Sequence, residues 1–287
     1  MFYLIIRIFS LLPLSVLYFI ADYMVYPVIR YLVCYRLKIV RKNIRLSFPE
    51  KTEKEQEAII NAFYRHFAEI VVEMVYGYRA SKEEMRERVV FDNLELLEDL
   101  ARKKHGVIAY LGHLCNWEWI ADVGNQFADK SIVEYNVYRK QKNANVDRAM
   151  LDLRSKRGGE CVEKNILLRK LVQLRHADHP FVIGLIADQK PSPHNAHTWT
   201  TFFNQETAFL DGGEVLARKF DLGVVYAHIT SPKRGHYLVH FEVITETPQE
   251  MPENEITMSY VRMIESNIRR QPERWLWTHN RWKWKRN

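Results

Sequence analysis

Cysteine is scarce in this sequence, and its few cysteines do not form a binding pattern. Cys34, Cys115 and Cys161 are the three in 287 residues; they lie far apart and include no CxxC pair. The sequence therefore lacks the spacing of zinc and redox sites, and we interpret the cysteines as reduced thiols facing a reducing compartment. Cys115 follows His113 by two positions, which argues against a nucleophile pair because residues two apart seldom face each other.

Glycine and proline are also few, at 11 and 10 residues, and the sequence has no internal repeat, low-complexity tract or long linker. Apolar residues make up 47% of the chain and aromatic residues 13%. This composition excludes a disordered or fibrous chain and predicts a compact body. One large domain is the favoured organisation, although the length also permits two small ones.

Acidic residues are outnumbered, with 35 Asp and Glu against 42 Lys and Arg, which gives a net charge of +7 and a pI of about 9.2. A basic chain favours an anionic partner. Phospholipid headgroups, an acidic carrier protein and nucleic acid all fit this description, and so does an ordinary basic surface that serves solubility. The net charge alone does not distinguish these partners, so the positions of the basic residues along the chain have to be considered.

The first 35 residues are almost continuously apolar and aromatic, interrupted by Arg7, Asp22 and Arg30. The stretch exceeds the ~20 residues that a bilayer span needs, and it lacks the basic start and cleavage site of a signal peptide. It predicts an N-terminal membrane helix, so that residues 1–35 anchor a catalytic domain of residues 36–287. The internal charges leave open one or two amphipathic helices lying in the membrane interface. Basic residues follow at once and place the body in the cytoplasm: Arg36, Lys38, Arg41, Lys42 and Arg45.

The body of the chain alternates short apolar runs with helical patterns. Helices are expected at 53–78 and 93–102, and strands begin with the run GVIAYL at 106–111. Further strands are expected at 131–138, 180–188, 223–230 and 237–244, with helices between them and at 211–220 and 255–270. This alternation predicts an α/β fold with a central mixed, mostly parallel sheet flanked by helices.

His113 and Glu118 are the candidate catalytic residues, in the segment HLCNWE. His113 follows an apolar strand, at the edge where α/β sheets bind ligands, and Asn116 is a favoured residue for beginning a helix. Glu118 then falls in the first helical turn and reaches back to the imidazole. Such a pair suits general-base activation of a hydroxyl or amine, with no metal. A histidine that only packs and hydrogen-bonds is the alternative.

The C-terminal segment PERWLWTHNRWKWKRN interleaves four tryptophans with basic residues. Trp275, Trp277, Trp282 and Trp284 alternate with arginines and lysines up to Lys285 and Arg286. This pattern predicts contact with membrane headgroups, and stacking on single-stranded nucleic acid is less favoured because the chain has an apolar N-terminus. Packing of the first two tryptophans into the core is also open.

The segment LGHLCNWEW resembles the His-x4-Asp/Glu signature of the glycerolipid acyltransferase superfamily, and its surroundings resemble the bacterial lipid A late acyltransferase family. The likeness extends through most of the chain in ordered blocks: YRLKIVRKNIRLSFPEKTEKE, NVYRK, IADQKP, TFFNQETAFLDGGEVLARK and PERWLWTHNRWK. The His-x4-Glu spacing alone is a weak signal. Six blocks in order are a strong one.

The resemblance implies a glycerol-3-phosphate acyltransferase-like fold and a role for each residue of these blocks. His113 is the base and Glu118 its partner, while Arg139 contacts the thioester carbonyl or a phosphate. Asp188 and Gln189 line the acceptor site or support the active-site turn. Asn116 orients that turn or only caps its helix.

The function expected from this resemblance is transfer of an acyl chain from acyl carrier protein or acyl-CoA to a lipid hydroxyl, without a metal or redox cofactor. The expected acceptor is a lipid A precursor at the cytoplasmic face of a bacterial inner membrane, with an anionic membrane as partner and no nucleic acid. Asn204 replaces a glycine found in many family members, and the Asn-Trp of HLCNWEW resembles relatives with other acceptors. A lyso-aminolipid or lysophospholipid acceptor therefore remains an alternative, as does a non-catalytic membrane-binding scaffold.

Overall fold

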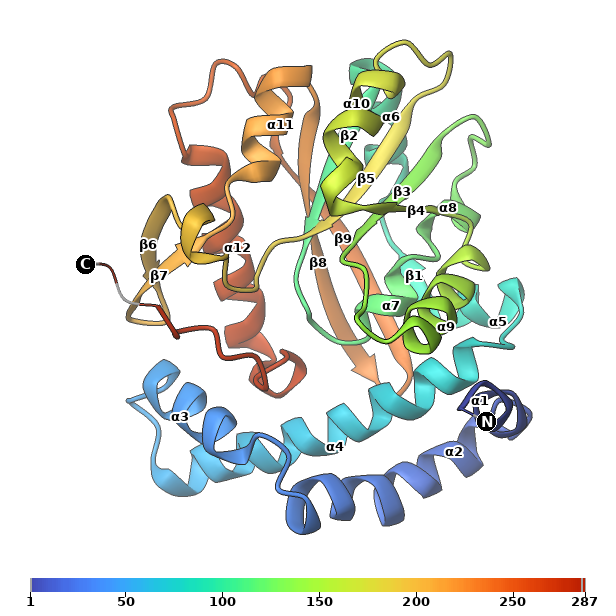
Figure 1. The fold of residues 1–287 in the computed structure, drawn as a ribbon, viewed down its shortest axis with the longest axis vertical. Helices are drawn as coiled ribbons and strands as arrows, with labels where there is room; N and C mark the ends of the chain where they lie inside the picture. Colours follow the sequence, from blue (N-terminus) through green and yellow to red (C-terminus); the bar gives the residue numbers. More distant parts are fainter. Residues whose placement is uncertain (1, 285, 287) are drawn as a thin grey trace.

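The computed structural model describes residues 2–284 and 286, with side chains from residue 6 onward. Its centre is a seven-stranded sheet in the order β1-β9-β8-β2-β5-β3-β4, in which every neighbouring pair is parallel except β8 and β9 (Figure 1). The strands are β1 Val89–Phe91, β2 Gly106–Leu111, β3 Val133–Tyr138, β4 Glu160–Glu163, β5 Phe181–Ile186, β8 Gly223–Lys233 and β9 His236–Thr245. The predicted α/β fold with a mixed, mostly parallel sheet is confirmed.

Helices cover both faces of this sheet because its central strands are apolar on both sides; all six residues of β2 are buried. On one face lie α6 Leu94–Lys104, α7 Trp117–Ile120 and α8 Val123–Gln126, and on the other α11 Gly212–Phe220 and α12 Glu255–Arg270. The chain also contains α5 Lys82–Arg88, α9 Ala144–Ser155, α10 Leu167–Leu174, short 3-10 helices at Lys164–Ile166, Pro193–Asn195 and Pro272–Arg274, and a hairpin of β6 Thr198–Phe202 and β7 Gln205–Phe209.

Helix α4, Glu53–Gly77, runs along the edge of the sheet at which β2 ends (Figure 1). A capping box begins it: the Thr52 hydroxyl accepts from the Glu55 backbone N–H, and the Glu55 carboxylate accepts from the Thr52 N–H. The helix confirms the prediction for residues 53–78, and it connects the N-terminal segment with the edge of the sheet at which β2 ends.

The N-terminal segment forms several short helices that pack on α4 rather than one long helix. These are α1 Phe2–Phe9, α2 Leu14–Ile20, two π-helical turns at Ala21–Val25 and Val28–Leu32, and α3 Leu37–Ser47. Within the described chain, no single helix has the length and apolar composition of a membrane span. The stretch Leu14–Leu32 together with Leu37–Ser47 meets these criteria as a pair, but the two are bent by 86°. The expected single membrane helix is therefore not found.

The charged residues that interrupt the apolar stretch explain this packing. Both carboxylate oxygens of Asp22 accept hydrogen bonds from Arg234, at 2.6 and 2.8 Å. Arg30 is buried, donates to the side chain of Asn61 at 2.9 Å and forms an ion pair with Glu57. Asp22 and Arg30 thus each have a partner in the body of the protein, and these polar contacts favour packing of the segment against it.

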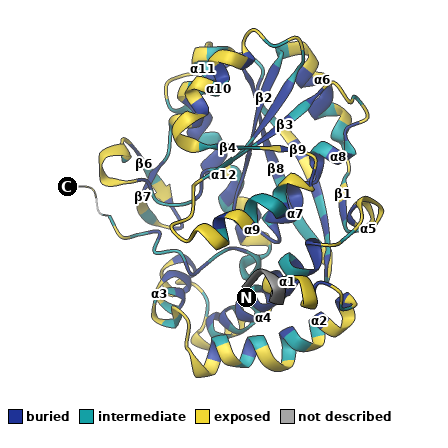
Figure 2. Ribbon diagram, turned by 45° about the vertical axis from the view of Figure 1, so that its right-hand side comes forward, coloured by how far each residue is buried: buried dark blue, intermediate teal, exposed yellow. Residues whose placement is uncertain are grey.

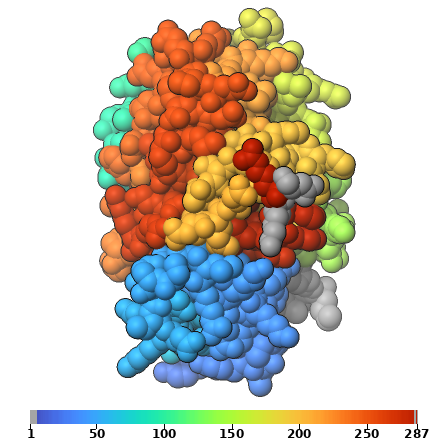
Figure 3. Space-filling model, turned by 90° about the vertical axis from the view of Figure 1, so that its left-hand side faces the viewer, coloured from blue at the N-terminus to red at the C-terminus, as the bar shows by residue number. Residues whose placement is uncertain are grey.

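The outer side of the N-terminal segment remains strongly apolar. Twelve of the nineteen large apolar side chains that are exposed among the described residues lie between positions 8 and 35. The N-terminal part of the chain forms one end of the molecule, in blue in Figure 3, and exposed positions run along the outer side of α2 in Figure 2. We call this set the apolar end surface: Ile8, Phe9, Leu11, Val16, Phe19, Tyr23, Met24, Val28, Tyr31, Leu32, Val33 and Tyr35.

Two of the C-terminal tryptophans pack into the core, which is the alternative left open from the sequence, while Trp282 and Trp284 are half-buried and their predicted membrane contact stays a prediction. Trp275 and Trp277 belong to the core, at 2% and 0% exposure. The indole N–H of Trp282 donates to the hydroxyl of Thr207 at 2.8 Å, and that of Trp284 donates to a backbone carbonyl at 3.2 Å. Indoles that are taken out of water need such acceptors, so Trp282 fastens the end of the chain to β7 and Trp284 fastens it to the segment that follows β5. Lys285 lies outside the described residues.

Candidate active site

His113 and Asp188 meet at the edge of the sheet because they follow two adjacent parallel strands. His113 comes two residues after β2, and Asp188 two residues after β5. The imidazole Nδ1 lies 2.5 Å from Asp188 Oδ1, and the backbone N–H of His113 donates to Oδ2 at 2.8 Å. The same carboxylate thus fixes both the ring and the backbone of His113.

The carboxyl group of Asp188 is only 1% exposed, but its surroundings favour the ionised form. Burial alone would raise its pKa, but the charge of His113, two hydrogen bonds from that residue and one from Trp275 together lower the pKa to about 2. The indole N–H of Trp275 donates to Oδ2 at 2.7 Å. An ionised carboxylate at this place holds a proton on Nδ1 of His113.

The other imidazole nitrogen is consequently left as an acceptor. The side-chain nitrogen of Gln189 lies 3.1 Å from Nε2 of His113. In the neutral imidazole whose proton on Nδ1 is donated to Asp188, Nε2 carries the lone pair and accepts from the Gln189 amide. A histidine held in this tautomer has the arrangement of a general base, and a hydroxyl that displaces the amide would donate its proton to the same lone pair.

Glu118 does not contact His113, contrary to the sequence prediction. Its carboxylate accepts two hydrogen bonds from the guanidinium of Arg154, at 2.6 and 2.8 Å, and one from the indole of Trp117 at 3.2 Å. The Trp117 ring packs edge-on against His113, with centroids 5.0 Å apart. A bidentate pair with a permanent cation from α9 is the stronger partner for a buried carboxylate, and spacing along one segment could not reveal it.

Asn116 does not cap the following helix, which is a second correction, because its side chain is turned toward α4. Its amide donates to the carboxylate of Glu73 at 2.8 Å. Glu73 is fully buried and also accepts from the hydroxyls of Tyr18 at 2.7 Å and Tyr237 at 2.6 Å. Burial raises the pKa of Glu73, and these three donors oppose that rise. Glu73 therefore joins α2, α4, β9 and the turn that carries His113.

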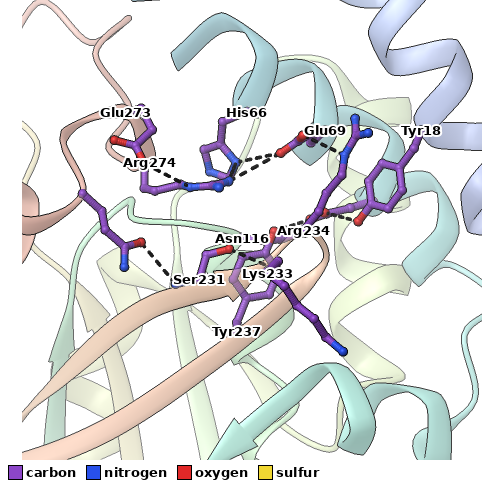
Figure 4. A network of polar contacts seen from close by, with 12 residues as sticks. Tyr18, His66, Glu69, Asn116, Ser231, Lys233, Arg234, Tyr237, Glu273 and Arg274 are labelled. Carbon is purple, nitrogen blue, oxygen red and sulfur yellow. Dashed lines mark hydrogen bonds and ion pairs between the residues drawn. The ribbon is translucent and has the colours of Figure 1, made fainter. Parts of the chain in front are cut away.

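The C-terminal segment also contacts the turn that carries His113. The backbone N–H of Cys115 donates to the carbonyl of Arg274 at 2.9 Å, and Leu114 and Trp275 form a β-bridge. The Arg274 side chain donates to His66 on α4 at 2.8 Å (Figure 4). Sequence reasoning named none of these supports individually, because they join segments separated by more than a hundred residues.

Two other residues considered from the sequence lie at this edge without a contact to His113. Cys115 is buried, and burial raises the pKa of its thiol to about 12, which excludes it as a thiolate nucleophile at neutral pH. Arg139 is exposed just after β3, and its backbone carbonyl accepts from Gln141 at 3.1 Å. In the described part of the chain, no three His, Cys, Asp or Glu residues are placed to hold a metal ion.

A cavity of about 60 Å³ lies on the α7 face of the sheet, beside the candidate base. Its floor is formed by alternate residues of β2 and β5, which share one face of the sheet. Trp117, the ion pair of Glu118 and Arg154, and helix α8 form its walls. The floor residues are Ala109, Leu111, Val182, Gly184 and Ile186. The lining is mostly apolar.

Comparison with known proteins shows extensive similarity to one family. The family described as bacterial lipid A biosynthesis acyltransferase matches residues 1–284. The lipid A biosynthesis palmitoleoyltransferase of Escherichia coli (strain K12) is 22% identical over 250 residues, which cover 86% of this chain and 79% of that protein. A lipid A biosynthesis acyltransferase of Shigella flexneri gives the same values. A second Shigella flexneri protein, lipid A biosynthesis acyltransferase 2, is 24% identical over 132 residues, or 46% of this chain and 41% of that protein.

Proposed function

Because this chain belongs to the bacterial lipid A biosynthesis acyltransferase family, and is therefore an acyltransferase, we propose that it moves a fatty acyl chain from a thioester to a hydroxyl of a lipid A precursor. Acyl carrier protein or coenzyme A carries the thioester. The observation that supports this reaction most strongly is the pairing of His113 with ionised Asp188 beside an apolar cavity.

In this proposal, His113 acts as the general base through Nε2. The acceptor hydroxyl replaces the Gln189 amide at Nε2 and loses its proton as its oxygen attacks the thioester carbonyl carbon. The tetrahedral intermediate then collapses, the C–S bond breaks, and the imidazolium returns the proton to the leaving thiolate. Asp188 stabilises the imidazolium without taking its proton, since the pKa of Asp188 is about 2.

The developing oxyanion needs hydrogen-bond donors or positive charge, and two residues are available at this edge. Once displaced from Nε2, the Gln189 amide is free to donate to the carbonyl oxygen. Arg139 is exposed after β3 and able to reach a bound thioester or a phosphate. We assign Glu118 a supporting role, in which its pair with Arg154 fixes the cavity that receives the acyl chain.

We further propose that the apolar end surface lies in the cytoplasmic interface of a bacterial inner membrane. The surface is too rich in large exposed apolar side chains for a face in water. Lys38 and Lys42, exposed on α3 beside it, would attract anionic headgroups. Docking in this way brings α4 and the active-site edge close to lipid acceptors.

The test is transfer by the purified protein in mixed micelles, using acyl-carrier-protein and CoA thioesters with a lipid A precursor, a lyso-aminolipid and a lysophospholipid as competing acceptors. Acylation of the lipid A precursor that is lost in His113→Ala supports the proposal. Acylation of only the lyso-lipids would reassign the acceptor. Transfer that survives in His113→Ala would reject the assigned base, and the scaffold alternative predicts no transfer by any form.

A further inference from the structure

Two lysines lie against one tryptophan ring near the end of the chain. The ammonium nitrogen of Lys190 is 4.9 Å from the centroid of the Trp284 ring, and that of Lys283 is 4.7 Å from it. The indole N–H of Trp284 donates to the backbone carbonyl of Pro191 at 3.2 Å, which holds the ring beside the chain that follows β5. Cation–π attraction therefore keeps two groups of like charge around a single ring.

The two ammonium groups have no negative partner. Neither Lys190 nor Lys283 forms an ion pair with a residue that the structure describes. Lys190 is half-buried and Lys283 is exposed, so the pair is open to a ligand. Burial, and then the charge of Lys283, lower the pKa of Lys190. The repulsion between two like charges costs free energy, which an anion bound between them would recover.

Further positive charge lies on the same C-terminal segment. Arg281 is only 2% exposed and has no ion pair with a described residue. Burial is the main cause that lowers the pKa of His279 to about 4, and the charge of Asp188 opposes it. The charges of Arg281, His113 and Lys190 lower this pKa further. The C-terminal side of the site is thus positively charged, as recognition of an anionic group requires.

The lysine pair adjoins the candidate base. Lys190 directly follows Gln189, whose side-chain nitrogen lies 3.1 Å from Nε2 of His113. Neighbouring Cα atoms along a chain are ~3.8 Å apart, so a group bound at Lys190 lies near an acceptor whose hydroxyl is bound at Nε2. The phosphate of a carrier's prosthetic group, in contrast, is separated from the thioester sulfur by the whole pantetheine arm. A phosphate of the acceptor is the better match.

We propose that Lys190 and Lys283 bind a phosphate monoester of the acyl acceptor and make the enzyme select phosphorylated acceptors. Two ammonium groups match the nearly double negative charge of this group, and each donates a charge-assisted hydrogen bond to a phosphate oxygen. Trp284 supplies the ring that holds both lysines. The inference rests on the proposed acyl transfer. A lipid A precursor and a glycerol lipid such as lysophosphatidic acid both present this phosphate group.

The experiment measures the acceptor KM of the full-length protein and of Lys190→Gln, Lys283→Gln and the double variant. The acceptors are a lipid A precursor, lysophosphatidic acid, and each molecule after a phosphatase has removed its phosphate monoesters. For the phosphorylated acceptor that the protein uses, each single variant should raise KM about tenfold and the double variant about a hundredfold, because each lost hydrogen bond to a charged group weakens binding. The acceptor that shows the rise identifies the source of the phosphate.

The KM for the dephosphorylated acceptors and the KM for the thioester donor should not change in these variants. Lys283→Arg keeps the positive charge and should give a KM close to that of the unmodified protein. Lys170→Gln is the matched control, because Lys170 lies 4.4 Å from the ring centroid of Tyr135 but pairs with Glu160 at the amino end of β4, at the opposite edge of the sheet. It should change no KM.

Three results overturn the phosphate subsite while acyl transfer stands. The first is an unchanged KM for the phosphorylated acceptor in a double variant that circular dichroism shows to be folded. The second is an equal rise of KM for the phosphorylated and dephosphorylated acceptors, and the third is an unmodified protein that prefers the dephosphorylated form. Absence of transfer to any acceptor overturns the proposed function, and this inference with it.

Discussion

The carboxylate of Glu118 and the guanidinium of Arg154 form a bidentate ion pair, with two hydrogen bonds of 2.6 and 2.8 Å. The pair joins the active-site helix α7 to α9 along the wall of the cavity. Its side chains are 6% and 20% exposed, so it is shielded from water and much less screened than a surface pair. Glu118 therefore has a structural partner that competes with any contact to His113.

Arg154→Gln should destabilise the protein because it leaves the Glu118 carboxylate buried with only the Trp117 indole as a donor. The expected loss is on the order of 3 kcal/mol in the free energy of unfolding, measured by urea denaturation. Adding Glu118→Gln should recover part of the loss. Arg148→Gln, at an exposed position of α9, is the control. Equal stability of the Arg154 and Arg148 variants would contradict a stabilising ion pair.

Glu73→Gln should reduce turnover without a comparable change in binding. A glutamine has one side-chain acceptor oxygen, whereas the Glu73 carboxylate now accepts from Tyr18, Tyr237 and Asn116. The active-site turn would shift, and small displacements of a catalytic group cost up to about a hundredfold in rate. We expect kcat to fall by about tenfold or more with KM nearly constant.

Tyr18→Phe is the companion variant, since it removes the donor from α2 and leaves the bond to Asn116. Its kcat should fall less than that of Glu73→Gln. A Glu73→Gln protein with unmodified turnover would show that Glu73 does not position the turn.

Glu134 should make stability depend on pH. Burial raises its pKa from 4.5 to about 8, so the folded protein binds this proton more tightly than the unfolded chain. The contribution of this proton to the free energy of unfolding is fully present below the pKa of Glu134 in the unfolded chain. It decreases as pH rises from about 4.5 to 8. Glu134→Gln should therefore be more stable, relative to the unmodified protein, above pH ~8 than near pH ~5, by on the order of 3 kcal/mol.

Urea denaturation at both pH values measures this difference. Glu87→Gln, at an exposed position, should show no such pH-dependent gain. A Glu134→Gln protein whose relative stability is the same at both pH values would mean that the Glu134 carboxyl is already ionised in the folded state.

Leu32→Glu should weaken binding to anionic vesicles because it places a charge in the apolar end surface, where Leu32 is 78% exposed. Burial of a leucine side chain contributes roughly 1.5–3 kcal/mol, so the partition coefficient should fall about tenfold or more. Val215→Glu, an exposed apolar position on α11, is the matched control and should bind normally. Equal binding by both variants in vesicle sedimentation would argue against the proposed membrane face.

The sequence predicted the elements that depend on local pattern. Alternating apolar runs located the main strands and helices, and the strand before His113 correctly placed this residue at the sheet edge. Pairings between distant segments were not predictable in the same way. Asp188 and Gln189 were singled out, but their contact with His113 depends on β5 lying beside β2, and Arg154 was not identified as the partner of Glu118.

The N-terminal segment shows a second limit of local patterns. Its hydropathy satisfied a membrane span, but Asp22 and Arg30 find partners on β8–β9 and α4 only after folding. The C-terminal tryptophans are a further case in which a local pattern does not reveal contacts with distant segments. Alternation with basic residues suggested a membrane contact for all four, whereas Trp275 and Trp277 are buried and the indole of Trp275 donates to Asp188.

The steady-state comparison of Asp188→Asn with Glu118→Gln tests most directly whether Asp188 is the partner of the base. With folding verified by denaturation, Asp188→Asn should lower kcat by roughly 10³–10⁴-fold with little change in donor KM, because His113 loses its tautomer and its counter-charge. Glu118→Gln should act mainly by raising donor KM. A Glu118→Gln protein as inactive as His113→Ala, alongside an Asp188→Asn protein with nearly normal kcat, would contradict the assignment.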